Sequence, residues 1–202
     1  MTPASPESEP EPPASGSGSG PAGALAATEL VILTGMSGAG RSTAANVLED
    51  LGWYVVDNLP PQMMLALARL AAEQTDVGVR KLVAVVDVRS GTFFTAFRDA
   101  LQSLREMGWA PRLIFVDAND EALVRRFESV RRPHPLQGQG RMLDGIIHER
   151  ELLADLRSEA DVLIDTSGLN VHQLSAKVSQ IFAGSGGPPL RLAVMSFGFK
   201  YG

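Results

Sequence analysis

The apolar positions of the chain fall into short runs separated by stretches with helical spacing. Uninterrupted apolar runs predict strands at residues 30–34, 53–56, 81–86, 112–116, 162–164 and 190–196. Helices are predicted over 42–51, 60–73, 92–107, 120–129 and 142–157, and a last one begins at Asn170, whose spacing to Gln173 fits a capping box. Strands that alternate with helices are typical of βαβ units, so we expect an α/β fold with an open parallel sheet and helices on both faces.

Domain organisation follows from where this pattern begins. Residues 1–27 are rich in Pro, Ser, Gly and Glu, and such a segment buries too little apolar surface to offset the entropy of ordering. We expect a disordered tail there and one folded domain over residues 28–187. Between the predicted helices 120–129 and 142–157, Pro133 and Pro135 predict a loop over 131–140.

Charge and composition exclude several classes of protein. The net charge is −5, and three glutamates of the tail supply part of it, so the remainder is nearly neutral and a globally basic nucleic-acid binder is not indicated. The absence of cysteine excludes disulfides, iron–sulfur clusters and thiol catalysis. No secretory signal is recognisable, and no apolar run approaches the ~20 residues of a membrane helix. We expect a cytoplasmic protein without membrane contact.

The most informative motif is GMSGAGRST at residues 35–43, which follows the first predicted strand and precedes the first predicted helix. This context fits a phosphate-binding loop (P-loop, Walker A), in which glycines let successive backbone N–H groups surround phosphate oxygens; the alternative is an ordinary glycine-rich turn. We therefore predict a P-loop NTPase fold of the kinase-like type, which binds a nucleoside triphosphate through Gly35, Met36, Ser37, Gly38, Ala39, Gly40, Arg41, Ser42 and Thr43.

Arg41 stands where the usual loop has Lys. A guanidinium is broad, planar and suited to bidentate phosphate contacts, so we expect binding to survive this exchange and turnover to be slow. Arg41 is accordingly a catalytic candidate. The Ser42 hydroxyl is in the position that coordinates Mg²⁺ in such loops, with Thr43 as a helper.

Four predicted strands end in an aspartate: Asp57, Asp87, Asp117 and Asp165. Ligands of an open parallel sheet lie outside the carboxyl ends of its strands, so these carboxylates are expected to converge near the loop. Asp57 and Asp87 are the catalytic candidates, and the Mg²⁺ ion is assigned to Ser42 and Asp57, with Asp87 as the alternative. For Asp117 and Asp165, helix capping is the competing interpretation.

An arginine-rich segment follows the fourth of these strands. It contains Arg125, Arg126, Arg131 and Arg132, with His134 close behind. Many P-loop kinases carry an arginine-bearing lid there, which neutralises charge on a transferring phosphoryl group; the other interpretation is a solvated basic helix face. His134 and His148 have no third ligand in suitable company, so a surface or hydrogen-bonded role is expected for each rather than a metal site.

Five strings in this order resemble one known family. They are GMSGAGRST (35–43), LGWYVVDNLP (51–60), DVRS (87–90), RRPHPL (131–136) and SFGFKYG (196–202). They resemble the RapZ/YvcJ family of bacterial P-loop nucleotide-binding proteins, also called RNase adapter proteins. The resemblance implies binding of ATP and GTP with slow hydrolysis, and it implies that a guanine-nucleotide motif consists of Asp87, Val88, Arg89 and Ser90. Family members commonly have Asn in place of Ser90.

The resemblance also implies a second domain. Family members continue beyond the last string, so residues 188–202 are expected to be a linker and the start of a C-terminal domain that this chain mostly lacks. Three functions stay open: a regulatory nucleotide-dependent NTPase, a P-loop small-molecule kinase, and an RNA-binding adapter for a ribonuclease, since some members present small RNAs to such an enzyme. A protein partner and a homo-oligomer are further expectations.

Overall fold

A five-stranded parallel sheet organises the part of the chain that the computed structural model describes, which is residues 29–73, 80–88 and 91–183. The strand order is β2-β3-β1-β4-β5, and every neighbouring pair is parallel. The strands are β1 (Glu29–Gly35), β2 (Tyr54–Leu59), β3 (Lys81–Val86), β4 (Arg112–Asp117) and β5 (Val162–Asp165). The predicted open parallel sheet is confirmed, whereas the tail 1–27 and the strand predicted at 190–196 lie outside the described residues.

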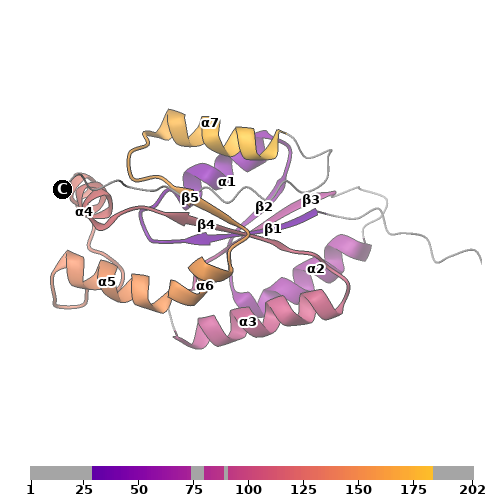
Figure 1. Cartoon of the computed structure of the whole chain (residues 1–202). Coiled ribbons are helices and arrows are strands. Elements are labelled where there is room, and N and C mark those ends of the chain that lie inside the picture. Colours follow the sequence, from indigo (N-terminus) through magenta and orange to yellow (C-terminus); the bar gives the residue numbers. More distant parts are fainter. Residues whose placement is uncertain (1–28, 74–79, 89–90, 184–202) are drawn as a thin grey trace, which may run out of the picture.

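The helices form a layer on each face of this sheet. In Figure 1, α1 and α7 cover one face, α2, α3 and α6 lie on the other, and α4 lies beside the end of the sheet next to α5. Their bounds are α1 (Arg41–Asp50), the 3-10 turn η1 (Pro61–Met63), α2 (Met64–Glu73), α3 (Gly91–Glu106), α4 (Asp120–Val130), α5 (Met142–Leu152), α6 (Ala154–Glu159) and α7 (Val171–Phe182).

The hydrophobic core lies between the sheet and these two layers. The three central strands β3, β1 and β4 are almost entirely buried, as their continuous apolar sequences predict for strands covered on both faces. From α3, the side chains of Phe97 and Leu104 are fully buried, and Val178 of α7 is fully buried on the opposite face. Burial of a side chain of this size stabilises the fold by about 1.5–3 kcal/mol. The two-sided core therefore fixes the position of β1 and of the loop that follows it.

The helix termini show both a confirmed and a wrong prediction. The capping box of α7 is confirmed, because the Asn170 side chain accepts the Gln173 N–H at 2.9 Å and the Gln173 side chain accepts the Asn170 N–H at 3.0 Å. The single helix predicted over 142–157 is wrong. It is interrupted at Leu153, whose backbone leaves the helical region at φ −97° and ψ 2°, and whose side chain is buried. No Gly or Pro marks this break, so the sequence pattern passes over it.

Candidate nucleotide-binding site

The loop that joins β1 to α1 lies at the carboxyl end of the central strand. Its backbone needs glycine at three positions, because Gly35, Gly38 and Gly40 have φ values of 144°, 79° and 107°. A side chain at Gly35 would also overlap the carbonyl oxygen of Val116 in the neighbouring strand β4. These constraints explain why the sequence is rich in glycine here.

The N–H groups and the carbonyl groups of this loop differ in their hydrogen bonding. Within the described residues, the N–H groups of Gly38 and of residues 40–43 have no hydrogen-bond acceptor. The carbonyl oxygens of Gly38 and Ala39 accept hydrogen bonds from outside the loop, from Arg126 at 3.1 Å and from the Thr166 hydroxyl at 2.7 Å. A loop with free N–H groups, followed at once by a helix N-terminus, is arranged to bind an anion.

Arg41 and Asp87 lie together beside the loop. The Arg41 guanidinium is 3.5 Å from the Asp87 carboxylate and donates a hydrogen bond of 3.5 Å to the carbonyl of Val86, at the end of β3. Because β3 is a direct neighbour of β1, Asp87 is the strand-end acid closest in the sheet to the loop on that side. Ser42 is exposed in the first turn of α1, and Thr43 is half-buried.

Asp57 has a different environment. Strand β2 continues to Leu59, so Asp57 lies within the strand, on an exposed position one strand further from the loop than Asp87. Its carboxylate accepts the N–H of Asn58 at 2.7 Å, and Asn58 has a positive φ of 52°. Within the described residues, Asp57 makes no ion pair or hydrogen bond with the loop. The role of either aspartate in Mg²⁺ binding stays a prediction.

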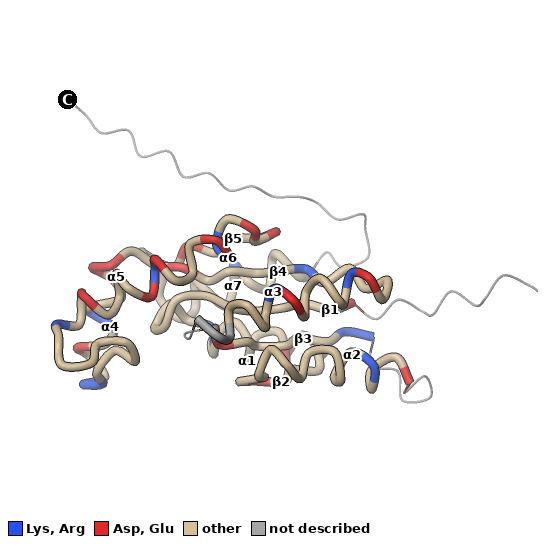
Figure 2. Tube along the Cα trace, turned by 90° about the horizontal axis from the view of Figure 1, so that it is seen from below, with Lys and Arg blue, Asp and Glu red and all other residues tan. Residues whose placement is uncertain are grey.

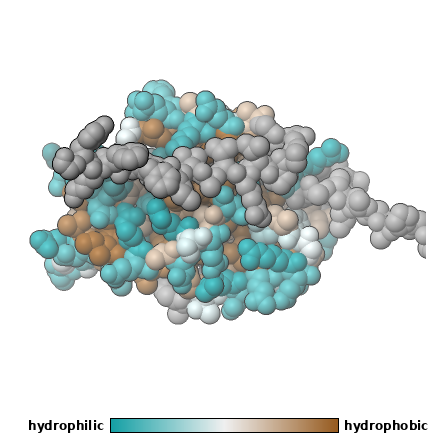
Figure 3. All heavy atoms as spheres, in the orientation of Figure 1, coloured by the Kyte–Doolittle hydropathy of each residue, from teal (hydrophilic) through white to brown (hydrophobic). Residues whose placement is uncertain are grey.

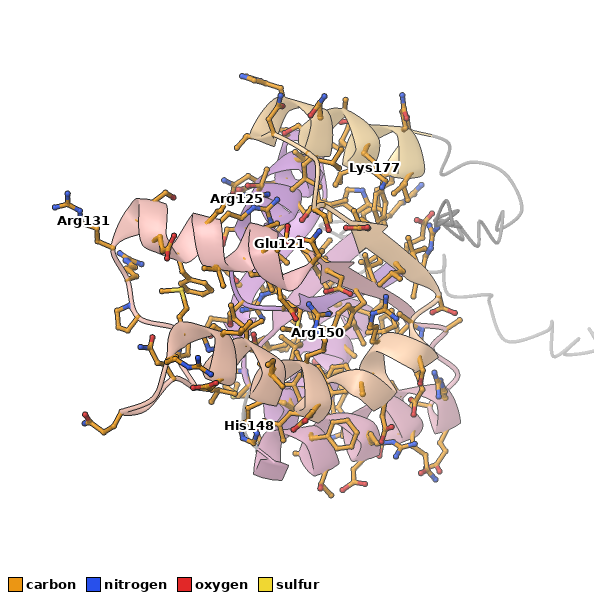
Figure 4. The ribbon with its side chains drawn as sticks, turned by 60° about the vertical axis from the view of Figure 1, so that its left-hand side comes forward. Glu121, Arg125, Arg131, His148, Arg150 and Lys177 are labelled. Carbon is orange, nitrogen blue, oxygen red and sulfur yellow. The ribbon has the colours of Figure 1, made fainter. Side chains whose placement is uncertain are left out.

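Asp117 does not converge on the loop as the strand-end pattern predicts. Its buried carboxylate is 3.0 Å from Nη1 of Arg150 on α5 and 2.8 Å from Nε of Arg157 on α6. Figure 4 shows Arg150 directed inward from α5, whereas His148 lies on the other side of that helix and is exposed. Asp117 therefore attaches both helices to the end of β4.

The capping interpretation of the last two aspartates is also wrong. Helices α4 and α7 are capped by Asn119 and Asn170 instead. The Asp165 carboxylate accepts the N–H and the hydroxyl of Ser167 at 2.9 and 2.5 Å. Burial raises the pKa of this carboxyl, but the hydrogen bonds from Ser167 and the charge of Lys177 outweigh it, so the pKa of Asp165 lies below its ordinary value.

The arginines of the segment after β4 behave differently from one another. Arg126 donates to the loop carbonyl of Gly38, and to the hydroxyl and carbonyl oxygens of Thr166 at 3.0 and 2.6 Å. Arg125 and Arg132 are exposed, and Arg131 projects away from the rest of the molecule in Figure 4. Of these four arginines, Arg126 is the one with a hydrogen bond to the loop, so it supports the loop backbone rather than covering the loop.

The sequence pattern did not single out Glu149, which is completely buried on α5. Its carboxylate accepts the N–H and the hydroxyl of Ser37 at 2.9 and 2.7 Å, and it lies 3.1 Å from Nε2 of His134. The position of Glu149 relative to the apolar residues of the helix could have indicated its burial. Glu149 falls between Ile146 and Leu153, which are both buried, so a charged residue occupies the apolar face of the helix.

The described residues contain neither a metal-binding cluster nor a membrane-spanning helix. No group of three or more His, Asp or Glu side chains there is arranged to hold a metal ion by itself. Among the same residues, no helix is both long and apolar enough to cross a membrane.

The sheet order, the loop after β1 and the helix that follows it define a P-loop nucleotide-binding domain of the kinase-like fold. The model of the RapZ-like N-terminal domain matches residues 28–186, and the chain belongs to this family. It is 61% identical to a nucleotide-binding protein of Renibacterium salmoninarum over 175 residues, which are 87% of this chain and 57% of that protein. A nucleotide-binding protein of Streptomyces coelicolor is 59% identical over 174 residues, which are 86% of this chain and 58% of that protein.

Solved structures confirm the fold. A shikimate kinase from Acinetobacter baumannii, in complex with shikimate, has a TM-score of 0.54 at 16% identity, covering 81% of this chain and 97% of that one. At this level of identity the similarity concerns the fold alone. The chain spans somewhat more than half the length of the curated relatives that it matches, 57–58% for the two named above.

Proposed function

We propose that this chain binds ATP and GTP together with Mg²⁺, hydrolyses them slowly, and acts as a nucleotide-responsive regulatory module. The observation that carries the proposal is the loop backbone: among the residues that the structure describes, the N–H groups of Gly38 and residues 40–43 have no acceptor, and the carbonyl groups of Gly38 and Ala39 are bound from outside the loop. Membership in a family whose curated relatives are called nucleotide-binding proteins supports it.

The metal is proposed on the chemistry of the residues beside the loop. An exposed hydroxyl at Ser42 and a carboxylate at Asp87 are oxygen ligands of the kind that Mg²⁺ prefers, and Asp57 remains the alternative acid. When bound, the ion would neutralise charge on the phosphate groups. For GTP, the proposed motif begins with Asp87 and Val88, and its last two positions, Arg89 and Ser90, lie outside the described residues.

Slow turnover is proposed from the state of Arg41. Its guanidinium is engaged by Asp87 and by the Val86 carbonyl, so contact with a phosphate group requires it to leave these partners. A residue that must first break existing contacts is less preorganised for the transition state than one already in place. Binding and slow hydrolysis suit a protein that responds to nucleotides more than one that turns over a metabolite.

The experiment compares nucleotide binding and phosphate release. Affinity for ATP and for GTP is measured with Mg²⁺ by titration calorimetry for the wild type, Arg41→Ala and Arg41→Lys, with the exposed Arg69→Ala on α2 as the control. We expect Arg41→Ala to weaken binding about tenfold, the effect of a lost contact to a charged group, and Arg41→Lys to retain it. Unchanged ATP affinity in Arg41→Ala would contradict the assignment of Arg41 to the nucleotide-binding site.

Further assays on the same protein distinguish the NTPase from a small-molecule kinase and from an RNA-binding adapter. Incubation with labelled ATP and a metabolite mixture would reveal a kinase by transfer of label to an acceptor, whereas label released as phosphate supports the NTPase. Salt-sensitive retention of RNA would support an adapter. Figure 2 shows acidic and basic positions interspersed over the described elements, so charge gives RNA binding little support.

A regulatory role requires a partner, and the surface offers limited apolar area for one. Hydrophilic side chains predominate on the visible part of the face in Figure 3, apart from small apolar areas. Exposed apolar side chains include Tyr54 on the edge strand β2 and Leu70 on α2, and Leu143 and Ile147 on α5. Binding of a protein partner or of a second copy is therefore proposed from the family resemblance, and sedimentation with and without nucleotide tests self-association.

A further inference from the structure

Glu149 is the most completely buried acidic residue among those that the structure describes. Its side chain is fully buried, and neither Lys nor Arg neutralises it within the described residues. Burial of an ionised carboxylate is unfavourable unless hydrogen bonds replace its water. Three donors do so here: the Ser37 N–H, the Ser37 hydroxyl and the His134 ring.

Two of these donors belong to the phosphate loop. Ser37 is the third residue of the loop, and both its backbone and its side chain are bound by the same carboxylate. This double contact fixes the peptide group between Met36 and Ser37 and the side-chain rotamer of Ser37. The free N–H groups begin at the next residue, Gly38, so the carboxylate sets the direction in which the anion-binding part of the backbone starts.

The third donor is itself held in place. Nδ1 of His134 accepts the N–H of Leu136 at 3.2 Å, so the hydrogen-bond pattern assigns the ring proton to Nε2, which donates to Glu149. The ring of Phe127 packs edge-on against the imidazole, with 5.0 Å between the two ring centroids. Gly145 leaves room for the imidazole, since a Cβ at that position would lie 2.8 Å from Nδ1 of His134. His134 therefore orients the carboxylate and cannot turn away without displacing its neighbours.

We propose that Glu149 is a positioning residue of the phosphate loop, oriented by His134, and that nucleotide affinity depends on this pair although neither residue belongs to the loop. The inference rests on the proposed nucleotide binding of this chain. It assigns a function to the segment RRPHPL that differs from the predicted lid. Through His134, that segment fixes the first half of the loop from beneath.

The first test replaces the carboxylate by its neutral isostere. Glu149→Gln keeps the shape of the side chain but presents an NH₂ group to one of the three donors. The control is Glu151→Gln, which removes the same charge from an exposed position of the same helix. Affinity for ATP with Mg²⁺ is measured by calorimetry at a temperature where both variants are folded. We expect Glu149→Gln to bind on the order of tenfold more weakly than the control.

The outcomes of this test distinguish failure of the inference from failure of the proposed function. Equal affinity of the two variants would overturn the inference, and so would tighter binding by Glu149→Gln, because a buried negative charge would then merely repel the phosphates. A wild type that fails to bind Mg²⁺ and ATP would overturn the proposed function and the inference with it. Wild-type binding with an unaffected Glu149→Gln overturns the inference alone.

The second test addresses His134 and does not depend on the folding of the first variant. His134→Gln retains a donor that can reach the Glu149 carboxylate, whereas His134→Ala does not. We expect His134→Ala to weaken binding several-fold and His134→Gln to restore most of the affinity. Thermal unfolding is measured alongside. A lower melting temperature in both variants with the same nucleotide affinity as the wild type would show a purely structural role and would contradict the proposal.

Discussion

Arg126 offers the sharpest test of how the loop is supported. Its guanidinium makes three hydrogen bonds: to the Gly38 carbonyl at 3.1 Å, and to the hydroxyl and carbonyl oxygens of Thr166 at 3.0 and 2.6 Å. Burial and the neighbouring charge of Arg125, opposed by Asp165, lower the pKa of Arg126, but an arginine remains protonated at neutral pH. Replacement by Ala removes all three contacts at once.

The magnitude follows from these contacts and from their partial exposure. Hydrogen bonds to a charged group are each worth about 1.5–3 kcal/mol when the partners stay buried, and water can replace part of this at a half-buried side chain. We therefore expect Arg126→Ala to lower the free energy of unfolding by about 2 kcal/mol. For a domain of this size, this corresponds to a fall in melting temperature of roughly 4–8 °C.

The effect on binding is measured separately from the effect on stability. Once the Gly38 carbonyl is released, it can rotate toward the phosphate groups, so we expect affinity for Mg²⁺ and ATP to fall on the order of tenfold. The matched control is Arg125→Ala, which removes the same charge from an exposed position of the same helix. If both variants bind ATP equally well at a temperature where they are folded, the reasoning about the loop carbonyls is refuted.

Three further outcomes are expected. Asp117→Asn should lower stability by about 1–2 kcal/mol in thermal unfolding, since two partly exposed arginines lose a charged partner while Arg150 keeps Asp120; unchanged stability would contradict this. Because the pKa of Asp165 is lower in the folded protein than its ordinary value of 3.8, its ionised form stabilises the fold at pH values above 3.8, and this stabilisation is lost as the pH falls through the folded pKa. Asp165→Asn should therefore make the stability less dependent on pH in the acid range. An unchanged pH dependence would count against the Ser167 contacts. Gly145→Ala should displace His134 and destabilise the protein by 1–3 kcal/mol, roughly the cost of overpacking, whereas wild-type stability would show that the ring can yield.

The phosphate loop could be predicted because its geometry is determined locally. Positive φ values at Gly35, Gly38 and Gly40 require glycine, so the conformation is visible in the residue types themselves. The same holds for the strands, whose continuous apolar runs indicate burial on both faces, and for the capping box at Asn170.

The supports of the loop could not be predicted because they come from distant parts of the chain. Glu149 reaches Ser37 across 112 positions, and Thr166 reaches Ala39 across 127. Nothing in the local sequence of either residue indicates its partner. The expectation that all four strand-end aspartates converge near the loop was wrong for Asp117 for a related reason, since its arginine partners become visible only when α5 and α6 lie against β4.

The pair formed by Arg41 and Asp87 makes the two ligands of such a site thermodynamically interdependent. A cation bound to Asp87 would compete with the Arg41 guanidinium for that carboxylate, and a phosphate bound to the guanidinium would draw one cationic partner away from Asp87. By reciprocity, each ligand must then raise the affinity for the other by the same factor. The measurable consequence is that ATP affinity rises with Mg²⁺ concentration more steeply in the wild type than in Arg41→Lys, whose compact ammonium group would form a weaker counterpart to the acid.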